Sequence, residues 1–435
     1  MRILLIQSYT YGTGDLIYPL GIVNIGTILK NEKHIVALCD LNLLGESYMT
    51  RISDIINNFN PDIIGLSIRN IDSTHESRVQ FFYEYIPPLV KLIKKAGENS
   101  LIMAGGSGFS LFAREIMSSN PEIDYGIIGE GEQTMLRLLM NLDDLENVEN
   151  LCFRRNNEII FTQRNYKNAI FEFIKPDYSI LSPKLYFKKG EYSIGIETKR
   201  GCTMKCSYCS YPYLNGAQLR FRKIELVLED IKSLYHNYGI DRFTFIDSVF
   251  NRPLKYSIDM AERIKALNLP VKWSAWFSEQ GFTEEYARLC QQAGCDFFTF
   301  SPDGFSKETL IALKKGIKTD EIIKIPDIMN KFTGISVIIN FFRFPPNQTI
   351  LGFLRLVIFN LKTRLKLKGR LKGIGLNRIR IEPYTDICRR SLNEGIIAKD
   401  QSLLYPVFYR NRGMKLLEKA FLILINIKNF IKDAF

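Results

Sequence analysis

Three cysteines lie within eight residues near the middle of the chain, and they carry the clearest chemical signal in the sequence. Cys202, Cys206 and Cys209 follow the spacing C-x3-C-x2-C. This spacing places three thiolates on one short loop, and thiolate sulfur is the soft ligand that iron–sulfur clusters take. A structural zinc site needs four ligands, and no second pair follows at a suitable distance. The spacing alone leaves a three-thiolate cluster site, part of a zinc site or three incidental cysteines as the alternatives.

The run from Lys199 to Cys209 resembles the signature of the radical S-adenosylmethionine (SAM) superfamily. The resemblance implies a [4Fe–4S] cluster held by Cys202, Cys206 and Cys209, with one iron left without a protein ligand. It also implies that this open iron chelates the amino and carboxylate groups of SAM. An electron from the cluster would then cleave SAM to a 5′-deoxyadenosyl radical.

The elements that position the cysteine loop are predicted to be six βα units within residues 191–385. We expect strands at 192–198, 242–247, 271–277, 296–301, 334–342 and 374–381. We expect helices near 223–238, 254–267, 283–293, 306–313, 319–331 and 348–360. Six parallel units are typical of a partial (β/α)6 TIM-type barrel, whose active site lies at the carboxyl ends of the strands. The cysteine loop follows the first strand, where such a site belongs.

Polar side chains near the cysteines and at the other strand ends are the candidates for binding SAM. The family resemblance implies that Tyr208 stands near the adenine and that the segment with Asp247 and Asn251 holds the amino group. Ser301 and Asp303 could meet the ribose or methionine end of SAM. Arg343 could pair with the SAM carboxylate, or it could form a salt bridge elsewhere.

Residues 1–148 show an earlier alternation of short apolar strands and amphipathic helices. The strands are predicted at Ile3–Gln7, Ile35–Asp40, Ile63–Ile68, Leu101–Gly105 and Tyr125–Ile128. Such a pattern specifies a parallel sheet covered on both faces, a doubly wound (Rossmann-like) α/β domain. Ligands of these sheets bind outside the carboxyl ends of the strands.

Those ends carry small and polar residues in phase with the strands, which indicates a large ligand. With Pro19-Leu20-Gly21 and Asp124-Tyr125, the pattern resembles the cobalamin-binding domain that precedes many radical SAM cores. The resemblance implies that cobalamin contacts Thr10, Gly12, Arg69, Asn70, Gly105, Gly106, Ser107, Gly129, Glu130 and Gly131.

One departure from the cobalamin-domain pattern concerns the ligand below cobalt. The motif Asp-x-His-x-x-Gly is absent, and the chain has only three histidines. We therefore expect no histidine below cobalt and place Arg69 or Asn70 at the lower face, with His75 as the alternative. A degenerate domain that no longer binds cobalamin is the competing interpretation.

Two remaining segments complete the domain prediction. Residues 149–190 are expected to form a linker with a small hairpin around Asn156-Asn157. Residues 386–435 are expected to form a short helical C-terminal extension, with helices at 403–408 and 414–431.

The bulk composition places the chain among ordinary globular proteins. Of its 435 residues, 46% are hydrophobic and 24% charged. The N-terminus is expected to be a first β-strand and not a signal peptide, and no window of about 18 uncharged apolar residues marks a membrane-spanning helix. The five other cysteines lie in mostly apolar contexts, which predicts free thiols in a reducing, cytoplasmic compartment.

The net charge of +12 favours anionic partners. The excess is concentrated at 362–372 and in the last 30 residues, so weak contact of this region with a membrane surface is one interpretation and a solvated basic face is the other. No attached RNA-binding module is recognisable, so nucleic acid is not the expected partner.

Together these patterns predict a cobalamin-dependent radical SAM enzyme. The resemblance implies methyl transfer to an unactivated carbon, or to phosphorus, of a small-molecule or peptide substrate. An electron donor such as flavodoxin or ferredoxin would reduce the cluster. The alternatives are a radical SAM cyclase that does not methylate and, from another class, a basic RNA- or membrane-binding protein with a structural cluster.

Overall fold

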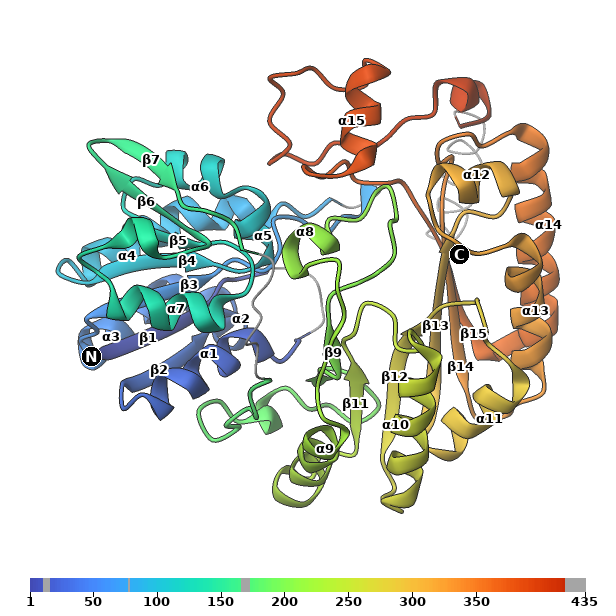
Figure 1. Ribbon diagram of the computed structural model, residues 1–435, viewed down its shortest axis with the longest axis horizontal. Helices are drawn as coiled ribbons and strands as arrows, with labels where there is room; N and C mark the ends of the chain where they lie inside the picture. Colours follow the sequence, from blue (N-terminus) through green and yellow to red (C-terminus); the bar gives the residue numbers. More distant parts are fainter. Residues whose placement is uncertain (11–15, 77–78, 166–172, 419–435) are drawn as a thin grey trace.

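The computed structural model describes residues 1–10, 16–76, 79–165 and 173–418, which form two α/β domains side by side (Figure 1). The first domain contains a sheet with the strand order β2-β1-β3-β4-β5-β6-β7. Its first five strands are parallel, and their order places the switch point between β1 and β3. They are β1 (Arg2–Gln7), β2 (Ile35–Asp40), β3 (Ile63–Ser67), β4 (Leu101–Gly105) and β5 (Tyr125–Ile127).

Helices cover both faces of this sheet, because the strands carry apolar residues on both faces. Ile3 and Leu5 pack with α1 and α7, whereas Leu4 and Ile6 pack with α3 and α4. The doubly wound fold predicted from the sequence is therefore confirmed. The helices are α1 (Leu20–Asn31), α3 (Tyr48–Phe59), α4 (Ile86–Ala96), α5 (Ser107–Leu111), α6 (Ala113–Ser119) and α7 (Gly131–Met140).

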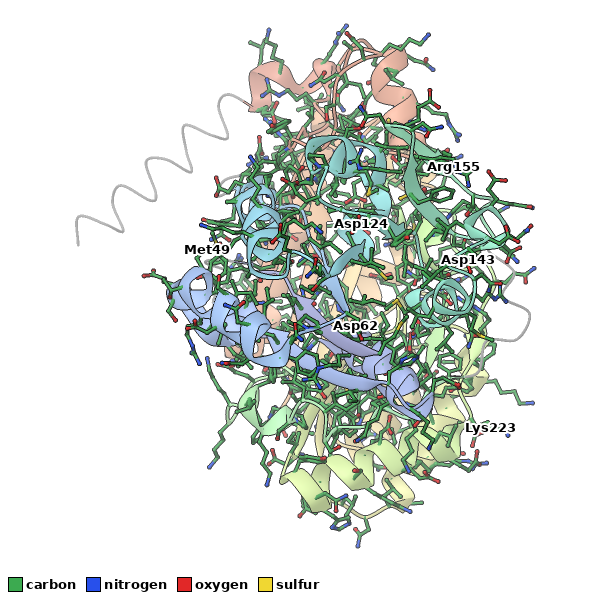
Figure 2. The ribbon with its side chains drawn as sticks, turned by 90° about the vertical axis from the view of Figure 1, so that its left-hand side faces the viewer. Met49, Asp62, Asp124, Asp143, Arg155 and Lys223 are labelled. Atoms are coloured by element: carbon green, nitrogen blue, oxygen red, sulfur yellow. The ribbon has the colours of Figure 1, made fainter. Side chains whose placement is uncertain are left out.

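Two aspartates fix the strands of this sheet at their amino ends. The backbone N–H of Arg2 donates to Asp62 at 2.7 Å, and that of Ile102 donates to Asp124 at 2.8 Å. Both aspartates are labelled in Figure 2. Because these bonds lie at the amino ends, the carboxyl ends remain available for a ligand.

The hairpin expected in the linker extends the first sheet. Strand β6 (Leu151–Arg155) pairs antiparallel with β5, and β7 (Glu158–Phe161) pairs with β6. The turn is formed by Asn156 and Asn157, which both have positive φ, the conformation of a two-residue type I′ hairpin.

The second domain is an open six-stranded parallel sheet with the order β15-β14-β13-β12-β11-β8. Its strands are β8 (Gly195–Ile196), β11 (Arg242–Phe245), β12 (Lys272–Phe277), β13 (Cys295–Asp303), β14 (Ser336–Phe342) and β15 (Leu371–Asn377). Helices line the outer side of the curved sheet in Figure 1, and one large apolar core fills the space between. This is the partial barrel that the sequence predicts.

The helices of the barrel match most of the predicted ranges, although α14 continues seven residues further than expected, to Leu367. They are α9 (Ile224–Tyr238), α10 (Leu254–Ala266), α11 (Glu284–Gln292), α12 (Lys307–Ala312), α13 (Thr319–Asn330) and α14 (Ile350–Leu367).

The C-terminal segment corrects one prediction. The helix expected at 403–408 does not form. Instead, the N–H of Ile381 donates to the carbonyl of Val407, and that of Tyr409 donates to the carbonyl of Ile379. Pro406 explains the difference, because it lacks an N–H and disfavours helix at the residue before it. A helix that the sequence did not predict, α15 (Asp386–Asn393), begins after Thr385, whose side chain accepts a hydrogen bond from Cys388 N.

All eight cysteines of the chain are free thiols. Among the described residues, no helix is long and apolar enough to cross a membrane. The compartment stays a prediction.

Candidate functional site

A cavity of about 630 Å³ opens where the first sheet faces the barrel. The carboxyl ends of β1, β3, β4 and β5 line it on one side, and β8, α8 (Tyr211–Asn215) and β11 line it on the other. Seven of the ten residues predicted to contact cobalamin are in this lining: Arg69, Gly105, Gly106, Ser107, Gly129, Glu130 and Gly131.

Glycine is required at the turn after β4. Gly106 has φ +98°, and a Cβ there would lie 2.7 Å from the carbonyl oxygen of Ile68. The close approach lets Gly108 N donate to the carbonyl of Arg69 at 2.9 Å. The β4 turn and the β3 loop are thereby held together as one wall of the cavity.

Arg69 is the charged residue that β3 places at this wall. Its side chain is exposed, and it lines the cavity. Burial lowers the pKa of Arg69, and the carboxylate of Asp40 opposes that shift. None of the three histidines lines the cavity, and the absence of a histidine below cobalt stays a prediction. The role of Arg69 at the lower face stays a prediction.

The other three predicted cobalamin residues are placed differently. Asn70 is exposed and outside the cavity lining. The backbone N–H and the hydroxyl of Thr10 donate to Asn42 at 2.8 and 3.0 Å, so Thr10 supports the β1 end without lining the cavity. Gly12 lies outside the described residues. His75 is exposed and does not line the cavity.

A buried group of charges joins the two domains beside the cavity. Arg200 donates to Glu132 at 2.6 Å and to Glu197 at 2.6 Å, and it lies 3.6 Å from Glu130. Burial lowers the pKa of Arg200, but the carboxylates of Glu132 and Glu197 outweigh it and raise that pKa. Burial also raises the pKa of Glu197, against the opposing charge of Arg200.

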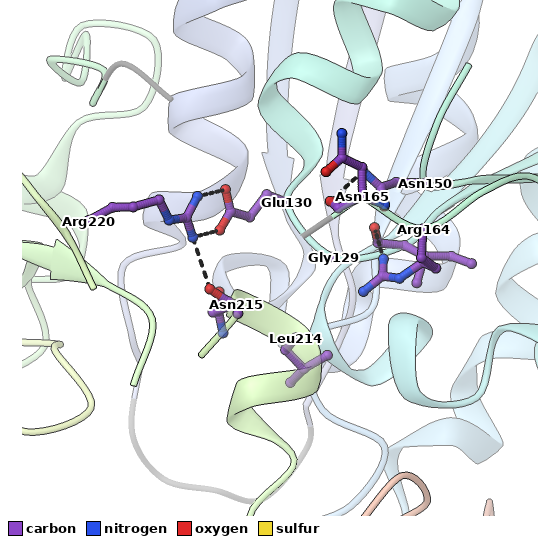
Figure 3. A pocket seen from close by; sticks show the side chains of 10 residues that line it. Gly129, Glu130, Asn150, Arg164, Asn165, Leu214, Asn215 and Arg220 are labelled. Carbon is purple, nitrogen blue, oxygen red and sulfur yellow. Dashed lines mark hydrogen bonds and ion pairs between the residues drawn. The ribbon is translucent and has the colours of Figure 1, made fainter. Parts of the chain in front are cut away.

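Figure 3 shows further contacts between the two domains, close to those of Arg200. Arg220 forms a bidentate ion pair with Glu130, in which one of the two hydrogen bonds is 2.8 Å long. It also donates to the carbonyl of Asn215 at 2.9 Å. Arg164 donates to the carbonyls of Ile128 and Tyr213. These contacts enclose a space of only about 20 Å³, room for a water-sized group, so this pocket is part of the domain contact.

The cysteine loop begins directly after β9 (Lys199–Arg200), which carries the interdomain arginine. Gly201 has φ +87°, and a Cβ there would lie 1.9 Å from the carbonyl oxygen of Gln218, so only glycine fits. Ser207 anchors the middle of the loop, because its N–H donates to Leu313 at 2.9 Å and its carbonyl accepts from Ile387 N at 2.7 Å. The loop ends in α8, whose residues line the cavity.

The three thiols fit an iron–sulfur cluster better than a single metal ion. All three are partly exposed and free. Burial raises the pKa of Cys206 and raises that of Cys209 to about 12, and the neighbouring thiols of the triad add to both shifts. Each thiol of the triad therefore disfavours ionisation of its neighbours. Yet no group of three or more His, Cys, Asp or Glu side chains among the described residues could hold one metal ion. A cubane takes one thiolate per iron, so its ligands need not converge on a point, and its positive irons would relieve the repulsion.

Tyr208 and Asp303 meet next to the triad, together with a lysine that was not predicted, and the predicted contacts of both residues with SAM stay a prediction. The hydroxyl of Tyr208 donates to Asp303, and Lys315 donates to the Tyr208 oxygen at 3.0 Å and pairs with Asp303. Burial raises the pKa of Cys206, and the charge of Lys315 opposes that rise. Nothing in the sequence alone shows that the ammonium group of Lys315 lies beside Tyr208 and Asp303.

Asp247 and Asn251 are buried and already satisfied by protein groups. Asp247 accepts from the N–H of Thr198 at 2.9 Å and from the ammonium of Lys199 at 2.7 Å. The amide of Asn251 donates to the carbonyl of Ser278 at 2.9 Å and accepts from its N–H at 2.7 Å. This placement favours a positioning role for both, and their predicted contact with SAM stays untested.

The remaining SAM candidates lie at the ends of β13 and β14. The hydroxyl of Ser301 accepts from Asn340 at 3.2 Å. Arg343 forms an ion pair with Glu76 on the loop after β3, so it joins the domains, as the salt-bridge alternative expected. Glu279 was not predicted. It is 3% exposed, its Oε1 has no hydrogen-bond partner among the described residues, and burial raises its pKa to about 7.

Comparison with known families matches both halves of the chain. Residues 12–139 match the B12 binding domain, and residues 196–357 match the radical SAM superfamily. The chain therefore belongs to the cobalamin-binding radical SAM enzymes. Cobalamin, a [4Fe–4S] cluster and SAM are the cofactors of these two domains, and the cavity and the cysteine triad fit them.

Individual relatives agree with this assignment. An uncharacterised methyltransferase of Pyrococcus horikoshii is 27% identical over 76% of this chain and 70% of that protein. An anaerobic magnesium-protoporphyrin IX monomethyl ester cyclase of Synechocystis is 24% identical over 69% of this chain and 60% of that protein. The fold is shared with the radical SAM methyltransferase TsrM of Kitasatospora setae, solved with cobalamin and [4Fe–4S] bound. It has a TM-score of 0.75 and 20% identity over 90% of this chain and 78% of TsrM. A second structure of TsrM contains a tryptophan substrate and a SAM analogue.

Proposed function

We propose that this enzyme transfers a methyl group to an unactivated carbon, or to phosphorus, of a biosynthetic intermediate. The observation that supports this most directly is the continuity between the two cofactor regions. Arg200 lines the cavity two residues before Cys202, and Tyr211, Leu214 and Asn215 line it shortly after Cys209. A single segment therefore holds the cluster ligands and forms a wall of the cavity, so the two cofactors share one reaction space.

When bound, these groups supply a methyl donor on cobalt and a SAM-derived radical that removes a substrate hydrogen. The residues of the chain hold and orient them. Cys202, Cys206 and Cys209 would hold the cluster, and Arg69 would face cobalamin from the wall of the cavity. The buried contacts of Arg200 with Glu130 and Glu132 keep the domains together beside that space.

The test is anaerobic reconstitution with iron, sulfide and hydroxocobalamin, followed by visible spectra and product analysis. We expect one cobalamin to remain bound and both S-adenosylhomocysteine and 5′-deoxyadenosine to form. Cys206→Ala should abolish 5′-deoxyadenosine, whereas Cys388→Ala, a change of another partly buried cysteine outside the loop, should leave it unchanged. A protein that never retains cobalamin would refute the two-cofactor proposal.

A cyclase that does not methylate is the second candidate, and the similarity to the magnesium-protoporphyrin ester cyclase favours it. Such an enzyme would form 5′-deoxyadenosine without S-adenosylhomocysteine. The ratio of these two products therefore distinguishes the candidates.

The partners belong to the same proposal. TsrM takes an amino acid, and we propose a small-molecule or peptide substrate here as well. The cluster needs a reductant, for which we propose a flavodoxin- or ferredoxin-type donor. The contact of the basic C-terminal region with a membrane surface also remains a proposal.

A further inference from the structure

Helix α14 has two apolar faces, and only one of them packs against the barrel. Its buried face contacts the domain core through Leu356, Phe359 and Leu367. Six other aliphatic side chains of the helix are 50 to 76% exposed. These six are Ile350, Leu351, Leu354, Ile358, Leu361 and Leu365. We call them the outer stripe.

The outer stripe is continuous along the helix. At about 100° of rotation per residue, its six members fall within about 100° of the helix circumference, and the buried face lies opposite. From Ile350 to Leu365 the stripe is about 22 Å long at about 1.5 Å per residue. Exposed leucines and isoleucines occur singly on most proteins, whereas a contiguous row of this kind marks an interaction surface.

The charges that α14 itself places beside the outer stripe are all positive. Helix α14 contains no Asp or Glu. Its Arg355, Lys362, Arg364 and Lys366 are exposed, and Lys368 and Lys372 follow directly. Lys366 pairs with Asp327 on α13; no ion pair is formed by the other three within the described residues. The helix thus places an aliphatic row between exposed cations, the pattern of helices that lie in the plane of a lipid surface.

We propose that the outer stripe of α14 docks on the surface of a membrane that contains anionic lipids. The aliphatic side chains would enter the boundary between headgroups and acyl chains, and the flanking cations would meet the phosphates. A second copy of this chain is a poorer partner, because it would bring two rows of cations together without an acid between them. The segment before the end of the chain packs on α14 through Met414 and Leu417, which join Phe353 and Val357 and not the outer stripe. The last 17 residues contain three lysines and one aspartate, so they would not neutralise the cations that flank the stripe. This inference does not depend on the proposed methyl transfer.

The test is flotation of the full-length, cofactor-loaded protein with vesicles. Vesicles of phosphatidylcholine alone are compared with vesicles that also contain phosphatidylglycerol, at low and high salt. We expect binding to be about tenfold stronger on the anionic vesicles and to weaken with salt, because salt screens exposed charges. Equal binding to both vesicle types, or no binding to either, would overturn the proposal.

Variants connect the binding to α14. The triple change Leu354→Gln, Ile358→Gln and Leu361→Gln should lower vesicle binding about tenfold or more, because it removes apolar surface that would be buried. A control triple change, Ile35→Gln, Met140→Gln and Leu185→Gln, alters apolar side chains elsewhere that are at least as exposed and should leave binding within about twofold.

A second set keeps the test decisive if the stripe variant is unstable. Arg355→Gln, Lys362→Gln and Arg364→Gln should remove the preference for phosphatidylglycerol while the aliphatic row stays intact. Unchanged flotation of a folded stripe variant would refute the assignment to α14. A dimer of the original protein that the stripe variant converts to a monomer would show that a second copy is the partner instead.

Discussion

The guanidinium of Arg200 lies 2.6 Å from the carboxylate of Glu132, and this contact joins the two domains beside the cavity. Arg200 belongs to the strand that leads into the cysteine loop, whereas Glu132 lies in the first turn of α7. Both side chains are at most 10% exposed. The position of the cluster loop is therefore tied to the helix that follows β5 of the cobalamin domain.

Replacing Arg200 with methionine should destabilise the protein strongly. The change would leave Glu132 and Glu197 buried without their main counter-charge, which costs about 3–5 kcal/mol. Chemical denaturation followed by fluorescence would measure the loss. Lys30→Met is the control, because the Lys30–Asp177 pair is exposed and should contribute less than about 1 kcal/mol. Similar stability of the two variants would show that the Arg200 cluster does not hold the domains together.

Arg69 and Asn70 form a natural pair of neighbours for testing the cobalamin site. Arg69 lines the cavity, whereas Asn70 is exposed outside it. We expect Arg69→Ala to weaken cobalamin retention about tenfold or more, because a large side chain and a charge leave the cavity wall. Asn70→Ala should retain cobalamin normally. Equilibrium dialysis with hydroxocobalamin measures both, and the opposite order would move the lower-face residue to Asn70.

The strands, the glycine turns and the cysteine triad could be predicted because each depends on local sequence. Ile3–Gln7 alternates between two apolar faces whatever lies around it, and Gly106 is needed by its own backbone geometry. The helix expected at 403–408 was wrong because Pro406 prevents a helix that the apolar residues alone would favour.

The direction of polar side chains could not be predicted, because it depends on contacts between distant segments. Asp247 and Arg343 were placed at the correct ends of their strands. However, Asp247 turns back to Lys199, and Arg343 reaches Glu76 across the domain boundary. The pairing of Arg200 with Glu132 depends in the same way on how the two domains pack. Sequence spacing located the site, but it could not separate residues that face a cofactor from residues that hold the loops.

Asp247→Asn tests this distinction directly. The Lys199–Asp247 pair is fully buried at 2.7 Å, so removing the negative charge should cost about 3–5 kcal/mol. It should also lower the iron content after reconstitution, because Lys199 lies just before the cysteine loop. Asp259→Asn, in an exposed pair with Arg263, should change neither quantity measurably. Normal stability and iron content combined with a raised KM for SAM would instead support direct contact between Asp247 and SAM.

Glu279 should make stability fall as the pH rises. Burial raises the pKa of this carboxyl from about 4.5 in the unfolded chain to about 7 in the folded protein. Between these two values the folded protein binds more protons than the unfolded chain does. The contribution of Glu279 to stability is therefore fully present at and below about pH 4.5. It declines as the pH rises toward about 7 and does not change further above that.

Glu279→Gln should abolish that decline, because glutamine has no proton to lose. The shift corresponds to about 3 kcal/mol between pH 4.5 and pH 8, so the variant should gain stability relative to the original protein as the pH rises. Unfolding midpoints measured across this range would show it, with Glu285→Gln as an exposed control. Parallel pH profiles for the original protein and Glu279→Gln would mean that Glu279 is already ionised at neutral pH, held in that form by the nearby ammonium of Lys315.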